Sequence, residues 1–409
     1  MDTGSSDLWL NSPTSRLCSY RLDPCAEAGT YNANGSSTYK FVSSDFAVSY
    51  ADGSGATGDY VTDHMSVGDI SLDDFQFGVG YESGSQDGIL GIGYQANEAQ
   101  VDTNGQRPYA NLPQALVESG RIKSNAYSLW LDDRDSASGS ILFGGVDTDK
   151  YRGSLQTLPV ERINGQYIHF VLAVSGMSMQ RDDDRGTLNT DLPFATILDS
   201  GSTITYLPDG LARDIYNALD VRYSRRQGAL CRCDLANENI SINFTFSSLT
   251  ISVPIRELVI NPEQSPGQQN SAVDKRQYFD SDESNSVCLF GISPTSGTVS
   301  ILGDTFLRSA YVVYDLDNNE ISMAQTNFDS TRNNVREIGT GTDAVPDATR
   351  VSNVVQASVT NSGGPRIGTP TTISGNDPDS AGSGISSLLT LPPLLISLLS
   401  ATLFLTVNL

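Results

Sequence analysis

Two copies of one short motif constrain this chain more than any other feature of its sequence. The first copy is Asp-Thr-Gly-Ser at residues 2–5, and the second is Asp-Ser-Gly-Ser at residues 199–202. Each copy is followed much later by an Ile-Leu-Gly, which starts at Ile89 in one half and at Ile301 in the other. A pattern repeated at long spacing indicates two copies of one structural unit. The sequence therefore predicts two related lobes that each present one aspartate.

Short apolar runs separated by turn residues fill both halves and indicate a mainly β, or all-β, fold. Helical patterns are few. Asn111 as a cap and Pro113 in the first turn predict a helix that ends at Gly120. A second helix is predicted near residues 209–219, and residues 317–319 predict the turn of a hairpin. We expect an N-terminal lobe over residues 1–155 and a C-terminal lobe over residues 156–327.

The composition excludes several classes of partner and cofactor. With 25 Lys and Arg against 48 Asp and Glu, the chain carries a formal net charge of −23. This charge opposes binding to nucleic acid or to an anionic membrane surface, and it suits an acidic environment. The five cysteines show no Cys-x-x-Cys spacing, so no metal site is expected. Residues 91–96 fit a dinucleotide-binding pattern, but the Ile-Leu-Gly repeat already explains them, so no cofactor is expected.

The C-terminal residues have a different character from both lobes. Residues 328–384 are rich in Ser, Thr, Gly and Pro and predict a disordered stalk. Residues 385–409 are apolar and follow small residues at Ser380, which predicts a signal for a glycosylphosphatidylinositol (GPI) anchor with Ser380 as attachment residue. The alternative is a retained transmembrane tail. Asn34, Asn239 and Asn243 begin triplets that accept N-linked glycans if the chain is secreted.

Two carboxylates that face each other cannot both ionise readily, so they share one proton. Such a pair can activate a water molecule against a peptide carbonyl. The neighbouring residues fit this task. A glycine follows two positions after each aspartate, and its N–H can reach the carboxylate; a hydroxyl, from Ser5 or Ser202, can orient an oxygen. The supporting residues are Thr3, Gly4, Ser5, Ser200, Gly201 and Ser202.

With these motifs, residues 1 to about 327 resemble the pepsin-like aspartic proteases, and among them the yapsin-like fungal enzymes that carry a GPI anchor. The resemblance implies a bilobal pepsin-like fold with pseudo-two-fold lobes. It also implies an endopeptidase in which Asp2 and Asp199 serve as acid and base, without metal or cofactor. The segment "SYADGSGATG" resembles the family's flap, with Tyr50, Asp52 and Gly53 near its tip and Trp9 supporting Tyr50.

The resemblance carries further expectations about partners and place. Protein or peptide substrates, a monomeric state and a location on the extracellular side of the plasma membrane or in the cell wall are all implied. Asp52 and the strong negative charge favour substrates with Lys or Arg near the cleaved bond. No nucleic acid is expected as a partner.

The cysteines predict two disulfides. Cys18 and Cys25 are close enough in sequence to close a short loop. By resemblance, Cys288 pairs with Cys233 rather than with Cys231, which leaves Cys231 free.

The chain begins at Met1, directly before the first aspartate, where family members have a signal peptide, a propeptide and several strands. One interpretation is that Met1 is an internal residue of a longer secreted enzyme. The other is that the start is genuine. The first catalytic loop would then lack support, and the protein would be an inactive binding or structural protein at the cell surface.

Overall fold

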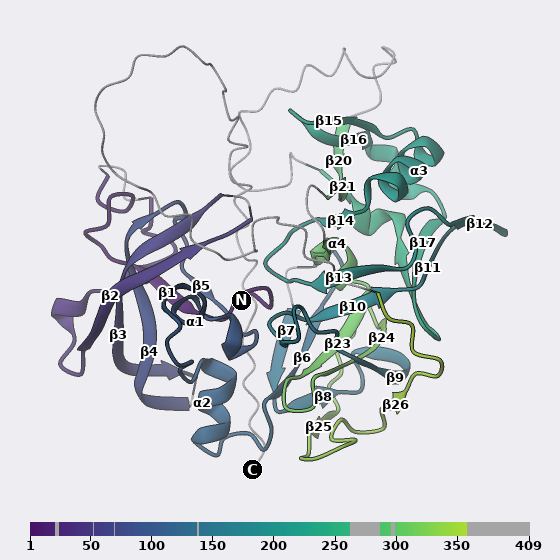
Figure 1. Cartoon of the computed structure of the whole chain (residues 1–409). Helices are drawn as coiled ribbons and strands as arrows, with labels where there is room; N and C mark the ends of the chain where they lie inside the picture. The colour runs from purple at the N-terminus through teal and green to yellow at the C-terminus, as the bar shows by residue number, and fades with distance from the viewer. Residues whose placement is uncertain are drawn as a thin grey trace, which may run out of the picture.

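The structure, a computed structural model, describes residues 1–20, 24–51, 53–68, 70–136, 139–261, 287–295 and 299–357. Figure 1 shows two lobes side by side, with the N-terminus between them. Both lobes are built mainly of strands, so the predicted all-β, bilobal fold class is confirmed.

The first lobe is built on a five-stranded sheet in the order β2-β3-β4-β1-β5. Its strands are β1 (Leu8–Asn11), β2 (Lys40–Ser49), β3 (Gly55–Val67), β4 (Ile70–Ser83) and β5 (Ile89–Leu90). The helices are η1 (Ala33–Gly35), η2 (Gln95–Asn97), α1 (Ala99–Asn104) and α2 (Leu112–Glu118). The helix predicted after Asn111 is confirmed as α2: the Asn111 side chain accepts a hydrogen bond from the Gln114 N–H, and Gly120 follows at a φ of 70°.

The second lobe contains a five-stranded sheet in the order β10-β13-β22-β14-β21 and two four-stranded sheets, β12-β11-β17-β18 and β15-β16-β20-β19. The strands of the five-stranded sheet are β10 (Val171–Val174), β13 (Phe194–Leu198), β14 (Thr205–Leu207), β21 (Ile292–Pro294) and β22 (Ser300–Leu302). The other strands are β11 (Gly176–Arg181), β12 (Asp184–Leu188), β15 (Arg222–Ser224), β16 (Gly228–Arg232), β17 (Ile240–Phe246), β18 (Leu249–Pro254), β19 (Val259–Ile260) and β20 (Val287–Phe290). The helices are α3 (Asp209–Leu219), η3 (Cys233–Asn237), η4 (Ile255–Leu258) and α4 (Asp304–Leu307). The second predicted helix is thus confirmed as α3.

The two five-stranded sheets share one local topology, as the sequence repeat predicts. In the first, β1 runs parallel to β4 and antiparallel to β5. In the second, β14 runs parallel to β21 and antiparallel to β22. Each Asp-x-Gly-Ser motif precedes the middle strand of its triplet, and each Ile-Leu-Gly begins in the antiparallel neighbour. The repeat therefore places equivalent residues at equivalent points of the two sheets.

A six-stranded sheet, in the order β26-β9-β24-β23-β6-β7, contains strands from both halves of the chain. Its strands are β6 (Ala126–Leu131), β7 (Gly139–Phe143), β9 (Tyr151–Pro159), β23 (Ala310–Asp315), β24 (Glu320–Thr326) and β26 (Thr349–Arg350). It lies in the lower part of Figure 1, with β6 and β7 nearest the first lobe. The hairpin predicted around residues 317–319 joins β23 to β24, with Asn319 at a φ of 55°. The expected lobe boundary after residue 155 falls within β9.

Residues 328–357, which we call the C-terminal strap, differ from the predicted disordered stalk. In the strap, β25 (Val335–Glu337) pairs with β8 (Gly145–Asp147), and β26 runs parallel to β9. Ile338 and Val345 are buried in one cluster with Trp130 and Tyr311 of the six-stranded sheet. The prediction is therefore wrong for residues 328–357, because a few spaced apolar side chains suffice when an apolar sheet face is available to bury them. The rest of the expected stalk, the apolar tail and Ser380 lie outside the described residues.

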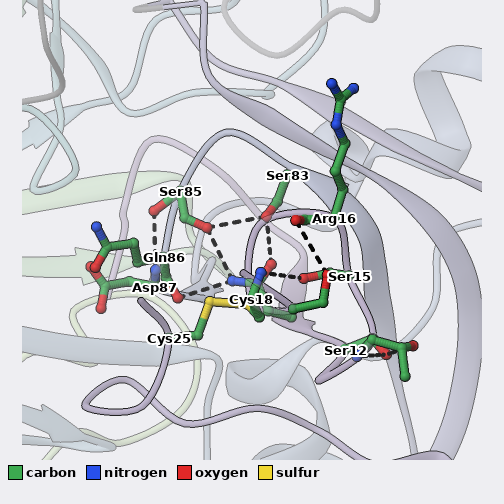
Figure 2. Close-up of a disulfide and its surroundings, with 12 residues drawn as sticks. Ser12, Ser15, Arg16, Cys18, Cys25, Ser83, Ser85, Gln86 and Asp87 are labelled. Atoms are coloured by element: carbon green, nitrogen blue, oxygen red, sulfur yellow. Dashed lines mark hydrogen bonds between the residues drawn. A yellow bond between two sulfur atoms is a disulfide. The ribbon is translucent and has the colours of Figure 1, made fainter. Parts of the chain in front are cut away.

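Disulfides join Cys18 to Cys25, as the sequence predicts, and Cys233 to Cys288, as the family resemblance implies. Cys231 is free and buried. Figure 2 shows the first disulfide beside the loop that carries Ser83 and Ser85. The side-chain amide of Asn11, the last residue of β1, donates to the Ser85 carbonyl at 3.0 Å, so this region holds the far end of the strand that leaves the first motif. Within the described residues, no helix has the length and apolar character needed to cross a bilayer.

Candidate active site

Each motif aspartate is fixed to the Ile-Leu-Gly of its own lobe by a backbone hydrogen bond. The Asp2 N–H donates to the Leu90 carbonyl at 2.9 Å, and the Asp199 N–H donates to the Leu302 carbonyl at 3.1 Å. The Ile92 N–H in turn donates to the Asp2 carbonyl at 2.9 Å. These contacts explain why the two short motifs recur together in each half of the sequence.

The two motif loops are fastened to each other by a reciprocal pair of hydrogen bonds. The Thr3 N–H donates to Ser200 Oγ at 3.1 Å, and the Ser200 N–H donates to Thr3 Oγ1 at 3.0 Å. The Thr3 hydroxyl also donates to the Leu198 carbonyl at 3.1 Å. A hydroxyl on the residue after each aspartate therefore sets the position of the opposite loop.

Each carboxylate is oriented by its own loop in the same way. Asp2 Oδ1 accepts from the Gly4 N–H at 2.8 Å, and Asp2 Oδ2 accepts from the Ser5 hydroxyl. Asp199 Oδ1 accepts from the Gly201 N–H at 2.8 Å, and Asp199 Oδ2 accepts from the Ser202 hydroxyl at 2.7 Å. The structure thus brings together all eight motif residues that the sequence singled out.

The motif glycines allow the two carboxylates to meet. A Cβ atom on Gly4 would lie 2.5 Å from Asp199 Oδ1, and a Cβ atom on Gly201 would lie 2.5 Å from Asp2 Oδ1. Any side chain at either position would collide with the carboxylate from the other lobe. Asp2 and Asp199 are each 7% exposed, and their side chains are hydrogen-bonded to one another. Burial, followed by the charge of Asp2, raises the pKa of Asp199, so this pair retains a proton well above the usual range of a carboxyl group.

The β2–β3 hairpin carries Tyr50 over this site. The Tyr50 N–H donates to the Ser54 carbonyl at 2.8 Å, and Gly53 adopts a φ of 83° that favours glycine. The indole N–H of Trp9 donates to the Tyr50 hydroxyl at 2.7 Å, and Trp9 is fully buried. Burial and the charge of Asp2 raise the pKa of Tyr50 well above its ordinary value, so the hydroxyl stays neutral. Asp52 lies outside the described residues.

The model of the family described as "Eukaryotic aspartyl protease" matches residues 1–326. The chain belongs to the eukaryotic aspartyl protease family. Its activity is that of an aspartic-type endopeptidase, a hydrolase. The C-terminal strap therefore lies entirely beyond the part of this aspartyl protease that the family model covers.

Fungal relatives agree with this assignment. The chain is 50% identical over 374 residues to "Probable aspartic-type endopeptidase opsB" of Aspergillus oryzae, an alignment that spans 91% of this chain and 74% of the relative. It is 35% identical over 365 residues to "Aspartic proteinase yapsin-3" of Saccharomyces cerevisiae, spanning 86% and 66% of the two chains. The crystal structure of an aspartic proteinase from Irpex lacteus has the same fold, with a TM-score of 0.60 at 21% identity, over 81% of this chain and 91% of that one.

The three expected glycosylation sites of this aspartyl protease differ in accessibility. Asn34 and Asn239 are exposed. Asn243 is only 6% exposed, and its amide nitrogen donates to Ser178 Oγ at 3.3 Å. It lies in the middle of β17, which is paired on both sides, by β11 and β18. The structure contradicts a glycan on Asn243, because its side chain is enclosed by the neighbouring strands and its amide is hydrogen-bonded to Ser178.

Sequence reasoning missed a group of buried polar side chains beside the site. Asp7 and Glu98 are 3% and 0% exposed, and Tyr60 and Tyr109 donate their hydroxyls to Asp7 Oδ1. The one available signal was the position of Asp7 between the first motif and Trp9. No pattern in the sequence places Glu98 or the two tyrosines near it.

Proposed function

We propose that Asp2 and Asp199 hydrolyse peptide bonds by activating a water molecule held between their carboxyl groups. The pair shares one proton, so one carboxylate can accept a proton from the water while the other carboxyl group donates one to the scissile carbonyl. No covalent intermediate with the enzyme forms. The observation that carries this proposal is the reciprocal approach of each carboxylate to the glycine of the opposite loop.

The hairpin that carries Tyr50 acts as the flap that closes over the substrate. A neutral Tyr50 hydroxyl held by Trp9 gives the flap a fixed position above the carboxyl pair. Closure excludes bulk water and strengthens the electrostatic interactions of the pair with the reacting carbonyl.

Replacing Asp199 by Asn tests the role of the pair. The amide is close in size to the carboxyl group but cannot share a proton, so we expect peptide cleavage at acidic pH to fall to background while the protein remains folded. Mass spectrometry of cleavage products gives the activity, and circular dichroism checks the fold. Cleavage at the wild-type rate by a folded D199N protein would contradict the mechanism.

We also propose that the enzyme acts at the cell surface, held by a GPI anchor attached near Ser380, and that it prefers Lys or Arg near the cleaved bond. The composition of the C-terminal residues supports the first point, and the net charge of −23 together with Asp52 supports the second. Release of the enzyme from cells by a phospholipase specific for phosphatidylinositol would test the anchor. Profiling a peptide library with wild type and D52N would test the preference. An identical preference in both proteins would show that Asp52 does not contribute to it.

A further inference from the structure

Asp7 is a buried carboxylate that has no cation beside it among the described residues. It lies between the first motif and Trp9, and it is 3% exposed. Its Oδ1 accepts from the Tyr60 hydroxyl at 2.8 Å and from the Tyr109 hydroxyl at 2.9 Å, and its Oδ2 accepts from the Ala99 N–H at 2.8 Å. Among the described residues, no ion pair involves Asp7. In this part of the chain, the three donors named above hold the carboxylate.

The hydrogen-bond pattern fits the ionised form of Asp7. Both tyrosine hydroxyls are oriented with their hydrogen toward Asp7 Oδ1. A proton on Oδ1 would face two donor hydroxyls, and a proton on Oδ2 would face the Ala99 N–H. Protonating Asp7 would therefore either break the hydrogen bond from the Ala99 N–H or force a tyrosine hydroxyl to turn from donor to acceptor.

These contacts link Asp7 to both parts of the active site. The Asp7 carbonyl accepts from the Gly91 N–H at 2.9 Å, next to the point where Asp2 is fixed. Two residues further on, Trp9 packs in one cluster with Tyr60, while Tyr109 and Tyr50 pack against that cluster. Trp9 in turn donates to the flap tyrosine. A shift of the Asp7 side chain would thus move the residues that pack against Trp9, and Trp9 holds the flap tyrosine.

We propose that Asp7 is a positioning residue for proteolysis: its ionised carboxylate holds Tyr60, Tyr109 and the start of α1 in the arrangement that fixes Trp9 beneath the flap tyrosine. Asp7 itself touches no substrate. This inference rests on the proposed mechanism of the Asp2–Asp199 pair and adds a third ionisable group that this mechanism does not use.

The titratable groups around Asp7 come from four elements. Tyr60 projects from β3, Tyr109 from the segment before α2, Glu98 from the position that caps α1, and Tyr50 from the flap. Among the described residues, Glu98 Oε2 accepts from the Tyr109 N–H at 2.8 Å, while its Oε1 is buried without a hydrogen-bond partner.

A neutral Glu98 is compatible with an ionised Asp7, because only one negative charge then occupies the cluster. Burial raises the pKa of Asp7, and the hydrogen bonds from the Ala99 N–H and from the hydroxyls of Tyr60 and Tyr109 oppose this rise.

Replacing Asp7 by Asn tests the proposal, with Asp63→Asn as the matched control. The NH2 of Asn cannot accept a hydrogen bond, so either the Ala99 N–H loses its acceptor or the tyrosine hydroxyls must turn from donors into acceptors, which disturbs the arrangement around Asp7. Asp63 is similarly buried, belongs to the same lobe, and accepts from Tyr31, Ser36 and Thr38. Tyr31 packs against a different apolar cluster from the one that contains Trp9.

The decisive measurement is kcat/KM as a function of pH for wild type, D7N and D63N. We expect kcat/KM of D7N to be about tenfold below wild type near pH 6, as the loss of a hydrogen bond to a charged group implies. The ratio of kcat/KM in D7N to kcat/KM in the wild type should approach one near pH ~3, where Asp7 of the wild type is itself protonated. For D63N, the same ratio of variant to wild-type kcat/KM should not change with pH. A pH-independent ratio for D7N would overturn the proposal.

Two further variants keep the test decisive if D7N folds poorly. Tyr60→Phe and Tyr109→Phe each remove one hydroxyl donor and leave the ring in place, and each should lower kcat/KM in the same pH-dependent way. In a Trp130→Phe background, Trp9 is the sole remaining tryptophan, so its emission reports on this region. Unchanged Trp9 emission and wild-type pH profiles in both variants would overturn the proposal, and activity in D199N would instead refute the mechanism of the pair.

Discussion

Glu98 makes the stability of the first lobe depend on pH in a way that one substitution can remove. Its side chain is fully buried, one of its oxygens has no hydrogen-bond partner, and no cation neutralises it among the described residues. Burial raises the pKa of Glu98 to about 9, and the charge of Asp7 adds to this, while the Tyr109 N–H opposes it. Glu98→Gln replaces the neutral acid by an amide of the same shape that cannot ionise.

The size of this pH effect on stability follows from the difference between the pKa of Glu98 in the folded chain and its pKa in the unfolded chain. A raised pKa in the folded state means that the folded chain binds this proton more tightly. The resulting stabilisation is fully present below the pKa of the unfolded chain and is lost as pH rises toward the folded value. The unfolded value is 4.5. At about 1.4 kcal/mol per pKa unit, the wild type loses about 3 kcal/mol through Glu98 between pH 4.5 and pH ~7.

Urea unfolding at pH ~4 and pH ~7 measures this loss. Wild type and E98Q should have equal free energies of unfolding at the lower pH, and E98Q should be more stable by about 3 kcal/mol at the higher pH. Glu118→Gln, an exposed change of the same charge at the end of α2, should follow the wild type at both pH values. If E98Q loses as much stability as the wild type on going to pH ~7, Glu98 is ionised in the folded protein and the reasoning fails.

Two more predictions concern stability and glycosylation. A chain that ends at Asn327 should be less stable than one that ends at Ala357 by on the order of 5 kcal/mol, because it exposes the sheet face that the strap buries, at ~1.5–3 kcal/mol for each large apolar side chain; equal melting temperatures would refute this role of the strap. In a secreted protein from a eukaryotic host, Asn34→Gln and Asn239→Gln should each remove one glycan mass, whereas Asn243→Gln should remove none, and a loss of mass in N243Q would contradict the buried position of Asn243.

The main features of the site were predictable because the repeat encodes them locally. An aspartate, a glycine and two hydroxyls at fixed spacing specify the loop, and the Ile-Leu-Gly specifies where the loop docks. Because the same pattern occurs in each half, the meeting of Asp2 with Asp199 follows from symmetry rather than from any long-range signal. The family resemblance carried by the glycine-rich turn and Trp9 predicted a flap at Tyr50, and the Trp9 indole does donate to the Tyr50 hydroxyl.

The features that were missed depend on contacts between distant segments. The environment of Asp7 is made by tyrosines 53 and 102 residues away in the sequence, which no local pattern connects to it. The strap has the composition of a disordered segment, and its order comes from the apolar face of the six-stranded sheet on which Ile338 and Val345 pack. Asn243 begins a glycosylation triplet in the sequence, but its side chain is buried in a strand that pairs with β11 on one side and β18 on the other.

The central claim, that the two aspartates act as one unit, is tested most directly by kcat/KM of the Asp2→Asn/Asp199→Asn double variant compared with both single variants. If the pair shares one proton and one water, either single substitution removes the whole contribution, and all three variants should reach the same residual activity. If the losses of the two single variants instead multiply in the double variant, each aspartate contributes on its own, and the shared-proton mechanism is contradicted.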